Sequence, residues 1–164
     1  MEIWLDGASY GFAQIEPHPA DRVLLMAGDA TPEWTDSPLF ACEDGRILDS
    51  STKPVGIHVD ISDSEGQNAA RAMVGMVQWI VITTGDWQMI PLENIVAAAQ
   101  KSGTKVVARI DDSQSIRGAA FALETGVDAL LIPPNQPVMW ADAQAIAAER
   151  LAVKSLGEES AFDE

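Results

Sequence analysis

The chain has 164 residues, of which 47% are hydrophobic, so it is long enough for one globular domain with a sizeable core. Its net charge of −15 would repel nucleic acid and anionic membranes, and it fits either salt adaptation or an acidic face for a basic partner. No run approaches the roughly 20 apolar residues of a membrane span. The N-terminus lacks a signal-peptide pattern, and a single cysteine, Cys42, fits a reducing compartment. We therefore expect a cytoplasmic protein.

Residues 1–54 are predicted to be an irregular part of the domain, because prolines interrupt them repeatedly. Asp6-Gly7 is interpreted as a turn after the first strand. Four short strands are predicted here, at residues 2–5, 22–26, 39–42 and 46–48.

From residue 55 onward, apolar runs alternate with helical segments. The predicted strands cover residues 55–61, 79–83, 105–110 and 128–132, and the predicted helices cover residues 65–77, 91–102, 114–125 and 138–156. In the first of these helices, Met73, Met76 and Val77 are expected to face the core. Repeats of about 25 residues are typical of tightly wound βα barrels. The continuous apolar strands indicate a parallel sheet that is covered on both faces.

We therefore predict an α/β fold with a mostly parallel sheet of consecutive βα units, similar to a whole or partial TIM barrel. Residues 1–157 would form one domain, and residues 158–164 a flexible acidic tail after a helix break at Gly157. Right-handed crossovers place every βα loop at one end of such a sheet, where ligands bind. Those loops are 60–63, 84–87, 111–113 and 133–135.

Three segments carry a family resemblance. They are Gly-Asp-Trp-Gln-Met-Ile-Pro-Leu-Glu-Asn-Ile at 85–95, Lys-Val-Val-Ala at 105–108 and Ala-Leu-Glu-Thr-Gly-Val-Asp-Ala-Leu-Leu-Ile-Pro-Pro-Asn at 122–135. With these strings the chain resembles the second, archaeal-type class of 3-dehydroquinate synthase, closely over residues 55–145 and loosely before them. Members of that family are much longer, and the chain carries Arg109 where they have a small residue.

The resemblance implies an NAD-dependent oxidoreductase of the shikimate pathway, which leads to the aromatic amino acids. The implied reaction is the oxidative deamination of 2-amino-3,7-dideoxy-D-threo-hept-6-ulosonate, followed by cyclisation to 3-dehydroquinate. It also implies a C-terminal half, supplied by a partner chain. Two alternatives stay open. One is a non-catalytic binding or assembly module, and the other is an aminohydroxybenzoate synthase-like enzyme of secondary metabolism that uses a metal.

The loop after the second regular strand supplies two site candidates. Asp86 is a candidate general base or ligand for a substrate amine, or else a turn residue that caps the next helix. Trp87 is a candidate substrate-stacking residue, or else an aromatic side chain under the loop. Glu93, in the expected first turn of the next helix, is a candidate catalytic partner of Asp86 or an arginine, unless it only complements the helix dipole.

Arg109 and Asp111, at the end of the third regular strand, are catalytic candidates. Arg109 suits a substrate carboxylate or phosphate, and an Arg109–Asp111 structural pair is the alternative. Asp60 and Asn135, in two other loops, are candidate substrate-binding residues. Lys105 suits Schiff-base chemistry but lies at the wrong end of its strand, so catalysis by it is not expected.

The cofactor evidence within the sequence is slight. His58 is interpreted as a core histidine, and no spacing predicts a metal site that includes His18. Three loop aspartates could together hold Mg²⁺ or Mn²⁺, namely Asp60, Asp63 and Asp111. No G-x-G-x-x-G or P-loop pattern is present, so NAD is implied by the resemblance alone.

Four βα units leave sheet edges that need cover from residues 1–54 or from another chain. A homo-oligomer or a complex with a partner chain is therefore expected, with a small molecule as substrate.

Overall fold

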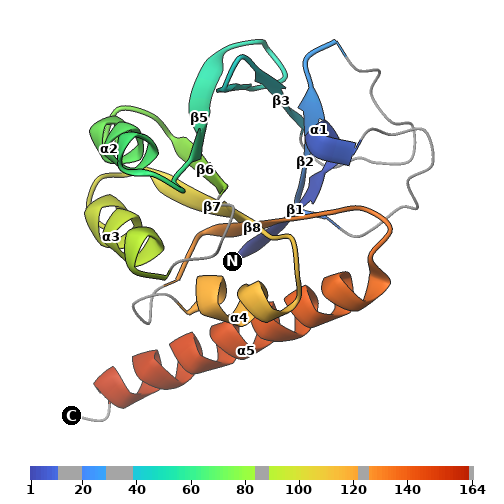
Figure 1. Ribbon diagram of the computed structural model, residues 1–164. Helices are drawn as coiled ribbons and strands as arrows, with labels where there is room; N and C mark the ends of the chain where they lie inside the picture. The colour runs from blue at the N-terminus through green and yellow to red at the C-terminus, as the bar shows by residue number, and fades with distance from the viewer. Residues whose placement is uncertain (11–19, 29–38, 84–88, 122–125, 163–164) are drawn as a thin grey trace.

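A computed structural model describes residues 1–10, 20–28, 39–83, 89–121 and 126–162 (Figure 1). Eight strands form a closed barrel in chain order: β1 (Glu2–Asp6), β2 (Arg22–Met26), β3 (Leu39–Glu43), β4 (Arg46–Leu48), β5 (Pro54–Asp60), β6 (Trp79–Thr83), β7 (Lys105–Arg109) and β8 (Ala129–Ile132). The helices are α1 (Gly7–Tyr10), α2 (Ser64–Met73), α3 (Met89–Ala99), α4 (Gln114–Ala120) and α5 (Pro137–Phe162). The predicted barrel-like α/β fold is confirmed.

The barrel is closed by the first and last strands. β1 pairs in parallel with β8 on one side and with β2 on the other. The four strands of the N-terminal third therefore complete the sheet, so the barrel is whole rather than partial and the expected open edges are covered within the chain. β4 alone runs against its neighbours, since it pairs antiparallel with both β3 and β5.

The helices pack on the outside of the regular βα part. Figure 1 shows α2 to α5 around the side formed by β6, β7 and β8, while the four-residue α1 lies beside β2. The predicted C-terminal ends of α2 and α5 are wrong. α2 ends at Met73, and Met76 lies in the turn beyond it with 75% of its surface exposed, so it does not face the core. α5 continues through Gly157, because a single glycine weakens a helix without necessarily ending it.

The strands place alternate side chains on the two sides of the barrel wall. Outward residues such as Ile80 and Ile82 pack with α2, α3, α4 and α5 in the larger apolar cluster. Inward residues form a second cluster inside the barrel, which includes Trp4, Leu24, Phe40, Trp79, Val107 and Leu131. The barrel is thus a packed core and not a pore, as in other small βα barrels.

The two ends of the interior differ. Toward the N-terminal ends of the strands, the rings of Trp4, Phe40 and Trp79 contact one another, with centroids 4.8 to 6.1 Å apart. We call these three rings the aromatic plug. Toward the C-terminal ends several inward side chains are polar, and these form the site described below. Within the described residues, no helix is long and apolar enough to cross a membrane.

Candidate functional site

A buried carboxylate and an arginine meet at the C-terminal end of the barrel. Asp6 ends β1 and is 1% exposed, and Arg109 ends β7, two strands away around the barrel. The Nε atom of Arg109 donates to Oδ2 of Asp6 over 3.2 Å. The strand order explains the contact, because both side chains point inward and β8 is the only strand between them.

Asp111 approaches the same guanidinium from the loop after β7. Its Oδ1 atom lies 3.7 Å from Nη2 of Arg109, and its side chain is half exposed. Arg109 itself is 24% exposed, so it sits between a buried carboxylate and one that faces solvent. The Arg109–Asp111 pair predicted from the sequence is therefore present, with Asp6 as an additional and more deeply buried partner.

His58 lies on the inner face of β5, where its ring bonds to the neighbouring strand. Its Nε2 atom and Oγ1 of Thr83, the last residue of β6, are 2.7 Å apart. Burial lowers the pKa of His58, and the positive charge of Arg109 lowers it further, while Asp6 and Asp60 act in the opposite direction. The lowered pKa favours the neutral imidazole at neutral pH, and a neutral imidazole can accept a proton.

Two aspartates of the loop after β5 have structural contacts. Asp60 accepts hydrogen bonds from the backbone and hydroxyl of Ser62, and these bonds lower the pKa of Asp60. Asp63 caps α2 by accepting from the backbone N–H of Gly66 over 2.8 Å. A Cβ atom at Gly66 would lie 1.8 Å from the carbonyl oxygen of Asp60, so only glycine permits this close approach. The loop is therefore tightly built at the rim of the barrel.

The family assignment rests on a match over most of this barrel. Residues 20–147 match the 3-dehydroquinate synthase II N-terminal domain. The chain belongs to this family. The match includes seven of the eight strands, β2 to β8, with the loops that carry Asp60 and Asp111.

Relatives within the 3-dehydroquinate synthase II family are named 3-dehydroquinate synthase. The protein of Methanothermobacter thermautotrophicus is 32% identical over 70% of this chain and 32% of its own length. That of Methanosarcina mazei is 33% identical over 84% of this chain and 38% of its own length. The protein of Methanocorpusculum labreanum is 25% identical over 89% of this chain and 40% of its own length. The chain thus spans about a third of these relatives.

The predicted site residues have different outcomes. Asp86 and Trp87 lie outside the described residues, so their roles stay predictions. Glu93 is partly buried. It lies in the second turn of α3, because the helix begins at Met89 and not at Pro91. The alternative of a first-turn interaction with the helix dipole is therefore wrong. Asn135 lies exposed after β8 in a left-handed conformation (φ 59°), which asparagine tolerates, and its binding role stays a prediction.

Lys105 begins β7, at the end of the barrel opposite to this site, as expected from its place in the strand. The suggested site for Mg²⁺ or Mn²⁺ is not formed. Asp60, Asp63 and Asp111 are all described, and no group of three potential metal ligands comes together within the described residues. Asp60 and Asp63 instead bond to their own loop and helix, and Asp111 lies beside Arg109.

The starts of α2 and α4 do not offer a pyrophosphate site for NAD. A dinucleotide pyrophosphate commonly binds backbone N–H groups at a helix N-terminus. At the start of α2 that role is taken by Asp63, and just before α4 Asp112 accepts from the backbone N–H of Ser115 over 2.9 Å. Both carboxylates would repel a pyrophosphate. If this family member uses NAD, the pyrophosphate binds at a place other than these two helix starts.

Sequence reasoning missed Asp6 and interpreted His58 as purely structural. Both could have been found from their positions within their strands. Asp6 ends β1 as Asp60 ends β5, so the rule that sites gather at strand C-termini applies equally to the first strand. For His58, the register with Val81 predicts an inward side chain one layer below that end.

Proposed function

We propose that this chain supplies the N-terminal barrel of a 3-dehydroquinate synthase II-like enzyme. The reaction is the NAD-dependent oxidative deamination of 2-amino-3,7-dideoxy-D-threo-hept-6-ulosonate and its cyclisation to 3-dehydroquinate, in aromatic amino-acid biosynthesis. The rest of the enzyme corresponds to the part of the relatives that does not align with this chain. The observation that carries the proposal is the group of inward polar residues at the C-terminal end of the barrel, within a chain of this family.

The substrate carries a carboxylate and an amine, and the site offers a group for each. The Arg109 guanidinium is a fork of donors that matches a carboxylate, while Asp6 and Asp111 hold it in place. The bonds from Ser62 lower the pKa of Asp60 further below neutral pH, and the ionised carboxylate suits a substrate ammonium group. These complementary charges would orient the substrate across the barrel mouth.

Ring closure requires a proton acceptor and a stabilised oxyanion. A carbon beside a ketone loses a proton, attacks the carbonyl formed by deamination, and leaves negative charge on that carbonyl oxygen. Neutral His58 is suited to take the proton, and Arg109 is suited to stabilise the charge. Thr83 would hold the imidazole in orientation through its hydroxyl.

The test uses the chain together with the remaining segment of the Methanosarcina mazei relative, which is 33% identical to it. The mixture is expected to release ammonia and to form 3-dehydroquinate when NAD is added. Arg109→Lys should raise KM and lower kcat, because Arg109 is assigned both the substrate carboxylate and the oxyanion, and His58→Asn should lower kcat. Arg117→Lys is the matched control, because Arg117 pairs with Glu149 on the outer helices.

The same assay is repeated with the chain joined covalently to that segment. If both the mixture and the joined protein are well folded but neither turn over nor bind the substrate, the proposal is contradicted. Asp86→Asn tests the undescribed loop in the same assay. If turnover requires Mn²⁺ and does not require NAD, the alternative of an aminohydroxybenzoate synthase-like enzyme is favoured.

A non-catalytic binding or assembly module is the second candidate, and one observation favours it. Arg109 is already neutralised by Asp6 and Asp111, and its side chain stands inside the barrel mouth. In that case Asp86→Asn and Arg109→Ala would leave cellular function intact, whereas a growth defect of either variant without added aromatic amino acids would favour the enzyme.

A further inference from the structure

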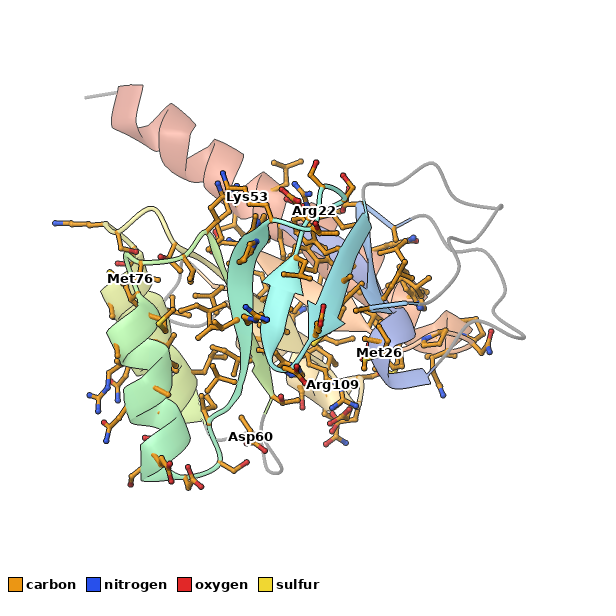
Figure 2. The ribbon with its side chains drawn as sticks, turned by 90° about the horizontal axis from the view of Figure 1, so that it is seen from above. Arg22, Met26, Lys53, Asp60, Met76 and Arg109 are labelled. Carbon is orange, nitrogen blue, oxygen red and sulfur yellow. The ribbon has the colours of Figure 1, made fainter. Side chains whose placement is uncertain are left out.

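The N-terminal mouth of the barrel carries a second concentration of charge, far from the site above. Arg22 begins β2, Lys105 begins β7, and Lys53 directly precedes β5. Figure 2 shows Arg22 and Lys53 at one end of the strands, and Asp60 and Arg109 at the other. Three acidic residues, Glu2, Asp21 and Asp128, lie at the same end, but the carboxylates of Asp21 and Asp128 accept backbone N–H bonds from the ends of neighbouring strands.

Two of these cations rest on the aromatic plug. The Cζ atom of Arg22 lies 4.7 Å from the ring centroid of Phe40 and 5.3 Å from that of Trp79. The Nζ atom of Lys105 lies 5.1 Å from the same Trp79 ring. Contact with an aromatic face holds a cation in place but provides no hydrogen-bond acceptor in the ring plane. The aromatic contacts therefore leave the N–H donors of both groups able to bond to other partners.

Most of those donors have no partner in the described protein. The Nε atom of Arg22 donates to Oε1 of Glu2 over 3.1 Å, and the two Nη groups have no acceptor within the described residues. The ammonium group of Lys105 likewise has no carboxylate or carbonyl partner within that part of the chain. Arginine with two unused Nη groups matches a pair of oxygens on one anion.

A cavity lies where these donors face. Its volume is about 290 Å³, and it is lined by Arg22, Gln78, Trp79, Gly103 and Lys105. This is close to the lower limit of ordinary small-ligand pockets, roughly 300 Å³, and ample for an oxyanion with a small organic group. The indole of Trp79 forms an apolar wall between the two cations.

We propose that this cavity binds a small oxyanion, a phosphate or carboxylate group, between Arg22 and Lys105 against Trp79. Glu2 opposes binding, because its charge lies beside Arg22, and it tunes the affinity downward. The site lies at the opposite end of the barrel from the proposed reaction and does not depend on it.

Titration of the folded chain tests the proposal. Inorganic phosphate and acetate are added separately, with chloride keeping the ionic strength constant, and the indole N–H signal of Trp79 is followed by NMR, assigned with Trp79→Phe. Phosphate, acetate or both should shift this signal in a saturable way. Lys105→Gln should weaken binding about tenfold or more, since a charge-assisted hydrogen bond is lost. Glu2→Gln should strengthen it.

Lys101→Gln is the matched control, because Lys101 is also exposed but does not line the cavity. It should bind like the unchanged chain. Lys105→Gln removes an exposed side chain and should fold normally, so the test does not depend on Arg22→Gln, which also disturbs the plug. An equal response in the unchanged chain and Lys105→Gln, a chloride response as large as that of the oxyanions, or no response at all would overturn the proposal.

Discussion

The two ends of the barrel hold their arginines in opposite ways. At the N-terminal end, Arg22 lies over the rings of the aromatic plug and has a carboxylate, that of Glu2, on one edge. At the C-terminal end, Arg109 lies between the carboxylates of Asp6 and Asp111, beside a neutral histidine. Packed aromatic rings at one end stabilise the fold. Buried charges at the other end cost desolvation free energy, but they provide groups that can bind a substrate and react. The following predictions test that contrast.

The largest effect is expected from the plug. Trp4 is fully buried, so Trp4→Ala removes its contacts with Phe40 and Trp79 and leaves a cavity. We expect a loss of about 3 to 5 kcal/mol in the free energy of unfolding, measured by urea denaturation. Trp4→Phe, which retains an aromatic ring, should lose clearly less. A loss below about 1 kcal/mol for Trp4→Ala would show that the plug does not stabilise the barrel.

The charge pair at the other end should behave differently. Asp6→Asn leaves Arg109 without its buried counter-charge and should cost about 1 to 3 kcal/mol. The double replacement Asp6→Leu with Arg109→Leu should recover most of that loss, because apolar residues remove the desolvation penalty of both charges. A double-mutant cycle in urea, with Asp6→Leu and Arg109→Leu also measured singly, gives this coupling. If the double variant is as unstable as Asp6→Asn or more so, the ion pair makes a net contribution to stability, which would contradict this prediction.

His58 should make stability depend on pH. Its pKa in the folded chain lies below the ordinary value of 6.5, so the unfolded chain takes up the proton more readily. The neutral ring makes its full contribution to the free energy of unfolding above about pH 6.5. That contribution is lost as the pH falls from there through the pKa of His58 in the folded chain. Tm should therefore fall more between about pH 7 and pH 5 in the unchanged chain than in His58→Asn. Parallel Tm curves for the two proteins would refute this assignment.

The smallest effect is expected away from both ends. Arg117 and Glu149 form a bidentate pair on the outer surface of α4 and α5, with both side chains exposed. Water screens such pairs, so Arg117→Ala should leave Tm and the urea midpoint unchanged within error. A clear fall in either value would mean that contacts between α4 and α5 depend on this pair.

Most of the architecture could be predicted from the sequence because it depends on local patterns. Continuous apolar runs identified β5 to β8, and the spacing between them indicated a barrel. Strand β4 was also predicted, at residues 46–48, but its reversed direction could not be predicted in the same way. It has three residues, and its direction depends on pairing with two neighbours that local sequence does not specify.

The site was predicted only in part, for a physical reason. Arg109 and Asp111 are neighbours in sequence, so their pairing was visible. Asp6 lies 103 residues from Arg109, and only barrel closure brings them together. Once the barrel was expected to include the first strand, an acidic residue at its end could have been added to the site. The exposure of Met76 was mispredicted because α2 ends one turn earlier than the apolar pattern suggested.

Closure by β1 and β8 also has a consequence for the order of folding. Glu2 pairs with Ala129, so the ends of the barrel meet across almost the whole chain. Contacts between residues so far apart give a high contact order, which slows folding. During synthesis from the N-terminus, β1 leaves the ribosome first but can pair on its β8 side only after the last strand has emerged. Until then the row of unpaired N–H and C=O groups along this edge of β1 stays open to other chains.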